Sequence, residues 1–388
     1  MSAAFSVFAP PSLPSLGAIH TIPEILGQPD LWLATWEELC RKEKDLGAFM
    51  EDAFQDPGRE VVLTGAGSSA FIGELLQGYY SRRLKRCVRA IPTTDIVTNP
   101  DECFAQDAPT LLISFARSGD SPESITAIDR ADECLSDVRH LIITCNPSGE
   151  LANHPTKHPG AVFILPPGAD DRGLAMTGSF TSMALAGLLM VDLDCLKDQE
   201  SRVRFMATAA ERILSTEGER FHELTRLGTK RAIFLGAGAL KGAARESHLK
   251  VQELTNGSVM CSYDSFLGFR HGPKAVLNDR TLVVVYLSND PHTRLYDLDL
   301  IAELRATQGD DNVLGITAAT GDTPGDDNIW DLPGLGRLSD AALALPAVLF
   351  AQLFGLQASL RAGRTPDNPF PAGEVNRVVQ GVTLHLPS

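Results

Sequence analysis

Short apolar runs alternate with longer amphipathic stretches along most of the chain. Each run has the length and the Val, Ile and Leu content of a buried strand, and the stretches between runs repeat with the period of a helix. In the first half we expect strands over 61–65, 88–91, 111–115, 140–144 and 161–165, and helices from residues 69, 122 and 177. Strands that alternate with helices predict a parallel sheet covered on both faces.

The second half of the chain repeats the first. An apolar strand runs into Gly65-Ala66-Gly67 in the first half and into Gly236-Ala237-Gly238 in the second, 171 residues later. Equal or nearly equal offsets of 171, 173 and 167 carry residues 111–113 onto 282–284, 143–144 onto 316–317 and 165–166 onto 332–333. Several landmarks at nearly one offset indicate a duplicated domain. We therefore predict an α/β protein with two tandem doubly wound parallel-sheet domains.

A helical segment is expected before the first domain. Thr21-x-x-Glu24 has capping-box spacing, and Trp32, Trp36 and Leu39 recur at helical spacing. The predicted organisation is a lead and helical clasp over 1–55, a first domain over 56–198, a helical connection over 199–230, a second domain over 231–364 and a tail over 365–388. Ligands of doubly wound sheets bind beyond the carboxyl ends of the strands, so candidate chemistry is sought there.

Composition narrows the class of protein. With a net charge of −15, the chain is not expected to bind nucleic acid or a membrane. The longest strongly apolar stretch that the pattern suggests, Met183 to Val191, is too short to cross a bilayer, and residues 1–20 lack a secretory signal pattern. A cytoplasmic location is expected. The seven cysteines form no Cys-x-x-Cys pair, which argues against a structural zinc site and a disulfide framework.

The first candidate site is the loop Gly65-Ala66-Gly67-Ser68-Ser69, which follows a predicted strand and opens a helix. Backbone N–H groups at a helix N-terminus suit a phosphate, and Ser68 and Ser69 add hydroxyl donors beside Gly67. Two alternatives stay open. The loop also satisfies G-x-G-x-x-A, the dinucleotide fingerprint, with Asp95 as its acidic partner, and it could be a purely structural tight turn.

The second candidate site is the loop 116–123, which follows the apolar strand 111–115. Ser121 is a good N-cap before Pro122, which is a structural reason for its presence. Arg117 and Ser118 have no such structural reason. A guanidinium, hydroxyls and free amides at a helix N-terminus favour a phosphate dianion.

In the second half, Glu246, Lys250 and Glu253 form one stripe on a predicted helix over 241–255, beside its apolar face. A simple Glu246–Lys250 ion pair would explain two of them. A partly desolvated Glu253 would be suited to shuttle protons. Downstream, His271 lies in the loop 266–274 between an Arg and a Gly-Pro turn, where it is a candidate acid or base.

Several sequence motifs resemble those of the sugar isomerase (SIS) domain family, and most closely those of its tandem-domain galactosamine-6-phosphate deaminase/isomerases, also called tagatose-6-phosphate ketose/aldose isomerases. The resemblance covers the chain from about residue 20 to its end. The motifs are residues 114–124, 244–247 through 253–255, 268–274 and 375–382.

The resemblance implies roles for individual residues. Ser69, Ser118 and Ser121 fall on phosphate-binding hydroxyls, Glu253 on the proton-shuttling base, and His271 on a ring-opening histidine that comes from a neighbouring subunit. Glu246 and Lys250 fall on an acid and a lysine of the family motif. Two positions depart from the isomerase domain of glucosamine-6-phosphate synthase: Arg117 replaces a neutral donor, and Gln380 replaces a lysine of the tail. A homodimer or larger homo-oligomer is implied.

The expected reaction is deamination and isomerisation of an amino-sugar phosphate, D-galactosamine 6-phosphate to D-tagatose 6-phosphate and ammonia. It requires no metal and no redox cofactor. Plain aldose/ketose isomerisation and deamination of glucosamine 6-phosphate remain alternatives. A non-catalytic sugar-phosphate sensor is a further one, although the acidic chain has no basic N-terminal segment that could bind DNA.

Overall fold

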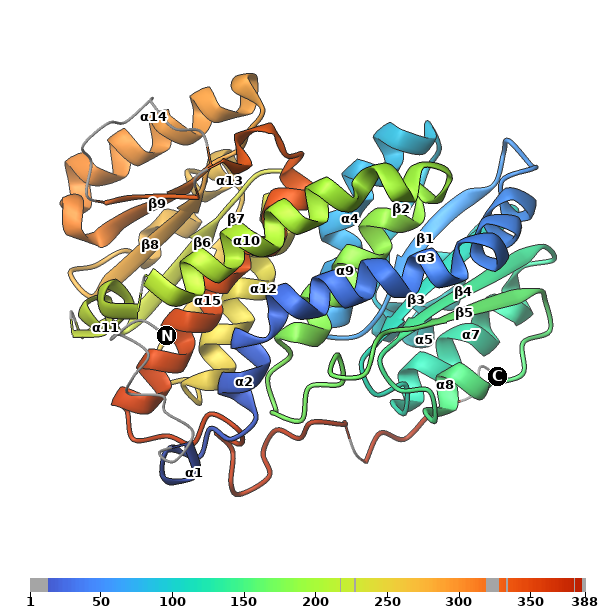
Figure 1. The fold of residues 1–388 in the computed structure, drawn as a ribbon, viewed down its shortest axis with the longest axis horizontal. Helices are drawn as coiled ribbons and strands as arrows, with labels where there is room; N and C mark the ends of the chain where they lie inside the picture. Colours follow the sequence, from blue (N-terminus) through green and yellow to red (C-terminus); the bar gives the residue numbers. More distant parts are fainter. Residues whose placement is uncertain are drawn as a thin grey trace. The chain divides into compact units, whose positions relative to one another are not determined.

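The computed structural model of the chain describes residues 13–216, 218–226, 228–318, 328–332, 334–379 and 381–385 (Figure 1). The chain divides into two compact units, each built on one sheet. The first-sheet unit comprises residues 31–171, 178–200 and 370–388, and the second-sheet unit comprises residues 1–30, 172–177 and 201–369. Each unit therefore takes in segments that are distant in the sequence.

The first-sheet unit has five parallel strands in the order β2-β1-β3-β4-β5. They are β1 Glu60–Thr64, β2 Val88–Ala90, β3 Thr110–Ala116, β4 Val138–Thr144 and β5 Gly160–Ile164. The unit's helices are α3 Gln28–Ala53, α4 Ser68–Leu84, α5 Thr93–Thr98, α6 Pro100–Cys103, α7 Pro122–Cys134, α8 Glu150–Asn153, α9 Gly178–Met190 and the 3-10 helix Leu193–Gln199. The strand order reverses between β1 and β3, so this is a doubly wound sheet with its switch point there.

Apolar side chains alternate between the two faces of this sheet. Val62 and Leu112, which are register partners, pack with Ile128 of α7 on one face. On the other face, α4 contacts α9, where the Tyr80 hydroxyl donates to the Gly187 carbonyl at 2.7 Å. All seven residues of β3 are buried, as expected for a central strand covered on both faces.

The second-sheet unit repeats the topology, with strand order β10-β9-β8-β6-β7. Its strands are β6 Arg231–Leu235, β7 Met260–Asp264, β8 Thr281–Tyr286, β9 Val313–Thr317 and β10 Ile329–Asp331. Its helices are α1 Leu13–Leu16, α2 Thr21–Leu26, α10 Glu200–Thr216, α11 Gly218–Arg226, α12 Ala239–Leu254, α13 Phe266–Phe269, α14 Pro291–Gln308 and α15 Asp340–Arg361, with 3-10 helices at Pro273–Val276, Asp310–Asn312 and Leu335–Arg337. Helices α13 and α14 cover one face, and α12 and α15 lie together on the other (Figure 1).

The predicted duplication is confirmed down to the backbone of one loop. Gly67 precedes α4 with φ 55° and ψ −130°, and Gly238 precedes α12 with φ 53° and ψ −124°. A side chain would be strained at this positive φ, so both copies need glycine there. The predicted fold class, two tandem doubly wound parallel sheets with an N-terminal helical segment, is correct.

Two details of the sequence interpretation are wrong. Thr21 and Glu24 form no capping box, because the N-cap of α2 is His20. The Thr21 hydroxyl instead donates to Asp367, and Glu24 accepts from the backbone N–H of Arg172. The stretch Met183 to Val191, predicted from the pattern to be the longest apolar one, is also shorter than the apolar helix α15. Helix α15 has the length and mean hydropathy, 1.7, of a membrane span, but 89% of its most apolar window is buried within the structure, as in a core helix.

Candidate active site

The first of the two candidate phosphate loops, residues 65–69, leaves β1 and begins α4. Its backbone is tightly folded, because a Cβ on Gly65 would lie 2.6 Å from the Ser69 backbone. Ser68 and Ser69 occupy the first turn of α4, each with 4% of its surface exposed. In the part of the chain that the structure describes, neither hydroxyl has a side-chain hydrogen bond. The loop therefore holds two serine hydroxyls and a helix N-terminus together at the carboxyl edge of the sheet.

The second phosphate loop leaves β3. Ser118 accepts a hydrogen bond from the Asp120 backbone N–H, while the Asn146 side chain donates to the Ser118 carbonyl at 2.9 Å. Ser121 is the N-cap of α7, but its hydroxyl forms no cap and instead lies 2.7 Å from the Ser124 hydroxyl. Ser121 thus lies at the predicted N-cap position, but helix capping does not explain why this residue carries a hydroxyl group. Asn146 was not predicted, since nothing in its local sequence indicates this contact.

The two loops leave neighbouring strands at the switch point of the sheet. Thr64 at the end of β1 and Ser114 of β3 are register partners, so the loops begin side by side. This is the position at which doubly wound sheets bind their ligands. The predicted residues Gly67, Ser68, Ser69, Ser118 and Ser121 all lie at this edge.

Arg117 lies in the same loop, but one arm of its guanidinium is engaged by the C-terminal tail. Its Nη2 donates to the Arg377 carbonyl at 2.9 Å, and the residue is 7% exposed. The Arg377 side chain in turn donates to the Asp171 carbonyl at 2.8 Å and pairs with Asp170. Asp171 is itself buried and accepts from the Ser179 backbone and hydroxyl at the start of α9. The tail is thus fastened beside the second phosphate loop.

In the second-sheet unit, Lys250 connects the two predicted acids of α12. Its ammonium lies 2.7 Å from Glu253 and 3.4 Å from Glu246. The side chains of Lys250 and Glu246 are 1% and 0% exposed, whereas that of Glu253 is 20% exposed. The predicted ion pair between Glu246 and Lys250 is present, and it is buried. Of the three residues, only Glu253 reaches solvent.

Packing keeps this part of α12 in place. The Ser247 hydroxyl lies 2.7 Å from the Tyr286 hydroxyl of β8, and both side chains are buried. Burial raises the pKa of the Tyr286 hydroxyl well above its usual range, so this group remains a neutral hydrogen-bonding partner. Helix α12 also packs closely on α15, where a Cβ on Gly355 would lie 3.2 Å from the Val251 backbone. A charged cluster inside such packing requires well-placed partners, which Lys250 and the two carboxylates supply for one another.

His271 lies in an exposed turn of the second-sheet unit, after α13. Its backbone N–H donates to the Gly268 carbonyl, and Gly272 follows it with φ 126°, a conformation that favours glycine. Within the described residues its imidazole forms no hydrogen bond with protein. The predicted residue Gln380 lies outside the described part of the chain.

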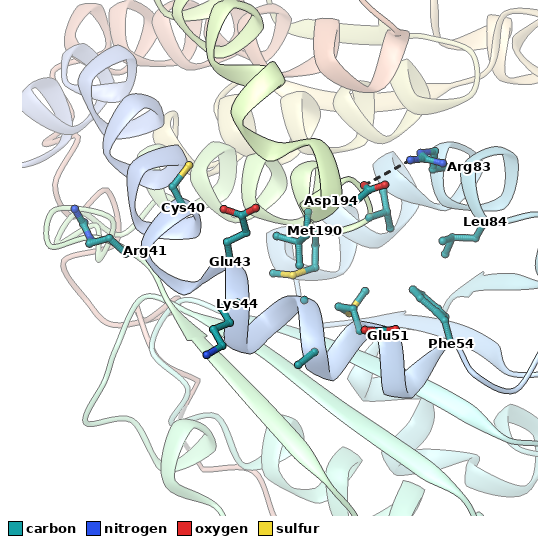
Figure 2. Close-up of a pocket in the computed structure, with 15 residues that line it drawn as sticks. Cys40, Arg41, Glu43, Lys44, Glu51, Phe54, Arg83, Leu84, Met190 and Asp194 are labelled. Atoms are coloured by element: carbon teal, nitrogen blue, oxygen red, sulfur yellow. Dashed lines mark ion pairs between the residues drawn. The ribbon is translucent and has the colours of Figure 1, made fainter.

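A cavity of about 780 Å³ in the first-sheet unit contains none of these residues (Figure 2). It lies between α3 and the end of α4, where Arg83 pairs with Asp194. That end of α4 is roughly 24 Å along the helix from Ser68. Neighbouring Asp192, Asp194 and Cys195 could reach one metal ion, but Asp192 already accepts from Tyr79 and Arg83. The cavity is therefore separate from the phosphate loops.

Relatives of known name share almost the whole chain. A Streptomyces coelicolor protein with a provisional assignment as D-galactosamine-6-phosphate deaminase AgaS is 51% identical and covers 95% of this chain and 96% of its own. The Escherichia coli D-galactosamine-6-phosphate deaminase AgaS is 41% identical and covers 94% of this chain and 95% of its own.

A solved structure agrees with these relatives. It is a Clostridium novyi protein provisionally assigned as a tagatose-6-phosphate ketose/aldose isomerase, with a TM-score of 0.94 and 38% identity over 98% of both chains. No protein-family model matches the chain. The identity to its relatives over nearly its full length shows that the chain belongs to the family of AgaS D-galactosamine-6-phosphate deaminases, as its motifs had indicated.

Proposed function

We propose that this chain converts D-galactosamine 6-phosphate and water to D-tagatose 6-phosphate and ammonia. Family membership supports the substrate class and the reaction. The observation that carries the assignment of residues is the pair of serine loops at the switch point of the first sheet, together with a carboxylate on α12 that reaches solvent beside a buried ammonium.

The phosphate loops bind the part of the substrate that does not react. Amides and hydroxyls at the N-termini of α4 and α7, among them those of Ser69, Ser118 and Ser121, would hold the 6-phosphate. Arg117 contributes positive charge nearby and holds the tail. Binding energy from this remote group orients C1 and C2 toward the groups that act on them.

Ring opening comes first in the proposed mechanism. His271 transfers a proton between the C1 hydroxyl and the ring oxygen, which breaks the hemiacetal and exposes the C1 aldehyde with an amino group at C2. An imidazole is suited to this step because it can donate and accept a proton near neutral pH.

Glu253 then moves one proton from C2 to C1. Removal of the C2 proton gives an enolate, which takes a proton on its C1 oxygen from the ammonium group at C2 and becomes an enol with a neutral amino group. Protonation of this enol at C1 gives an iminium ion at C2. Water adds to C2 and ammonia leaves, so the product is a ketose phosphate. Lys250, 2.7 Å from Glu253, orients the carboxylate and stabilises its negative charge, and Glu246 holds Lys250 from the buried side.

One experiment separates the related activities. The protein is incubated with galactosamine 6-phosphate, glucosamine 6-phosphate, galactose 6-phosphate and tagatose 6-phosphate in turn, and ammonia and ketose are both measured. Ammonia with tagatose 6-phosphate from galactosamine 6-phosphate is the expected result. Interconversion of galactose 6-phosphate and tagatose 6-phosphate without any ammonia from the amino sugars would establish plain isomerisation, the activity in the name of the Clostridium novyi structure.

We also propose that the protein is a cytoplasmic homo-oligomer, a homodimer or larger, in which His271 completes the site of a neighbouring subunit. Mixing inactive Glu253→Gln and His271→Ala subunits tests this arrangement. Recovery of activity on mixing is expected if the two residues that serve one site come from different chains. No recovery, in a mixture that exchanges subunits, would contradict it.

A further inference from the structure

The turn that carries His271, residues 270–274, is anchored to the second-sheet unit by residues before it and after it. Phe266 and Phe269 of α13 are 2% and 1% exposed and belong to the core under α14. Beyond the turn, the carbonyl of Val276 accepts a hydrogen bond from Arg231 at 2.7 Å. Between these anchors, residues 271–273 are exposed.

One acid of α14, Glu303, forms ion pairs with residues on both sides of His271. Glu303 lies 2.8 Å from Arg270 Nε through one carboxylate oxygen and 2.5 Å from Lys274 Nζ through the other. Arg270 directly precedes His271, and Lys274 follows it by three residues. The hydrogen bond from Lys274, and then that from Arg270, lowers the pKa of Glu303, so the carboxylate stays charged at neutral pH.

These ion pairs have little to do with overall stability. The side chains of Glu303, Arg270 and Lys274 are 37%, 28% and 29% exposed, and pairs this open to solvent stabilise a fold only weakly. Their geometry, however, restrains the backbone on both sides of an imidazole that has no hydrogen bond of its own within the described residues. A proton-transferring group needs this kind of restraint, since a displacement of about 1 Å can cost roughly 100-fold in rate.

We propose that Glu303 is a positioning residue for the reaction: it pairs with Arg270 and Lys274 at once and so holds His271 in place for ring opening. The inference rests on the proposed role of His271. Helix α14 carries none of the residues predicted from the motifs. The proposal gives this helix a role in catalysis, which it exerts through the turn.

A double-mutant cycle tests the inference on the intact protein with galactosamine 6-phosphate. Glu303→Gln should lower kcat about 10- to 100-fold and leave KM within about twofold, because the turn is misplaced while the phosphate loops are unchanged. Glu303→Asp should recover part of the rate. In a His271→Ala background, Glu303→Gln should cause no further loss, because the group that it positions is absent.

The control is Asp299→Asn, one turn earlier on the same exposed face of α14, where the carboxylate has no ion pair in the described structure. It should retain full activity, and all variants should melt within a few degrees of the wild type. Wild-type kcat in Glu303→Gln, or an equal loss with and without His271, would overturn the role of Glu303 and leave the proposed function standing. Full activity in His271→Ala would overturn the proposed ring-opening step and the role of Glu303 with it.

Discussion

Replacement of Glu253 by glutamine is the sharpest test of the proposed chemistry. The amide is nearly isosteric with the carboxylate, and its oxygen can still accept the hydrogen bond that Lys250 makes at 2.7 Å. Lys250 also keeps its second carboxylate, Glu246, at 3.4 Å. The buried ammonium is therefore not left unpaired, and the fold should survive the change.

The expected loss of turnover follows from the step that disappears. General acid–base groups contribute about 100- to 10,000-fold to a rate, and the amide can neither take the C2 proton nor return it to C1. We expect kcat to fall by that range, while the affinity for sugar phosphate changes by less than about threefold because the phosphate loops belong to the other unit.

Two assays measure these quantities separately. Ammonia release gives kcat, and calorimetric titration of the slow variant with galactosamine 6-phosphate gives the affinity. Exchange of the C2 proton with deuterated water should also stop in Glu253→Gln, and it should continue in a variant impaired only at a later step. A variant that still releases ammonia at a near-normal rate would remove Glu253 from the role of base.

The remaining predictions concern the phosphate loop, the tail, the buried lysine and the second sheet. Ser118→Ala should raise KM about 10- to 100-fold in steady-state kinetics with little change in kcat, since a hydrogen bond to a charged group contributes about 1.5–3 kcal/mol. Arg117→Ala should chiefly weaken sugar-phosphate binding and should also expose the tail to limited proteolysis, because the bond to the Arg377 carbonyl is lost; unchanged affinity would show that Arg117 does not serve the site. Lys250→Met should cost about 3–5 kcal/mol in urea denaturation, since it leaves buried Glu246 without its cation. Burial, and then the nearby Asp340 charge, raises the pKa of Asp297 from 3.8 to about 7. Between about pH 4 and 7, therefore, this group is ionised in the unfolded chain and protonated in the folded one. The free energy of unfolding falls by about 4 kcal/mol as pH rises through that window. Asp297→Asn should therefore raise the melting temperature at pH 8 much more than at pH 4, and an equal shift at both would contradict the assignment.

The sequence predicts the sheets well because their signal is local. A buried parallel strand such as β3 needs a continuous apolar run. The loop that follows β1 needs glycine at Gly65, because a Cβ there would lie 2.6 Å from the Ser69 backbone. Both requirements are visible within a few residues. The α12 stripe is visible for the same reason, because positions three and four apart share a face.

Contacts between distant segments leave no such signal. Nothing in the spacing of residues 370–379 indicates that the Arg377 carbonyl meets Arg117, and nothing near Glu303 indicates its two partners on the His271 turn. Thr21-x-x-Glu24 shows the opposite error. Its local pattern fits a capping box, yet Asp367 and the backbone at Arg172 engage these side chains instead.

The duplicated fold also offers a physical reason for the proposed division of chemistry between the two sheets. In the second sheet, the loop after the equivalent central strand β8 has its backbone N–H groups engaged by the protein's own carboxyl groups: that of Ser288 donates to Asp297, and that of Asn289 donates to Asp340. In the first sheet, the loop after β3 contains one acid, Asp120, whose carboxylate accepts from the Glu150 N–H. A phosphate approaching the β8 loop would find these two amides engaged and the Asp340 carboxylate beside them, whereas the β3 loop offers hydroxyls and a guanidinium. This difference supports the proposal that the phosphate binds at the first sheet and that the second sheet supplies the acid and the imidazole.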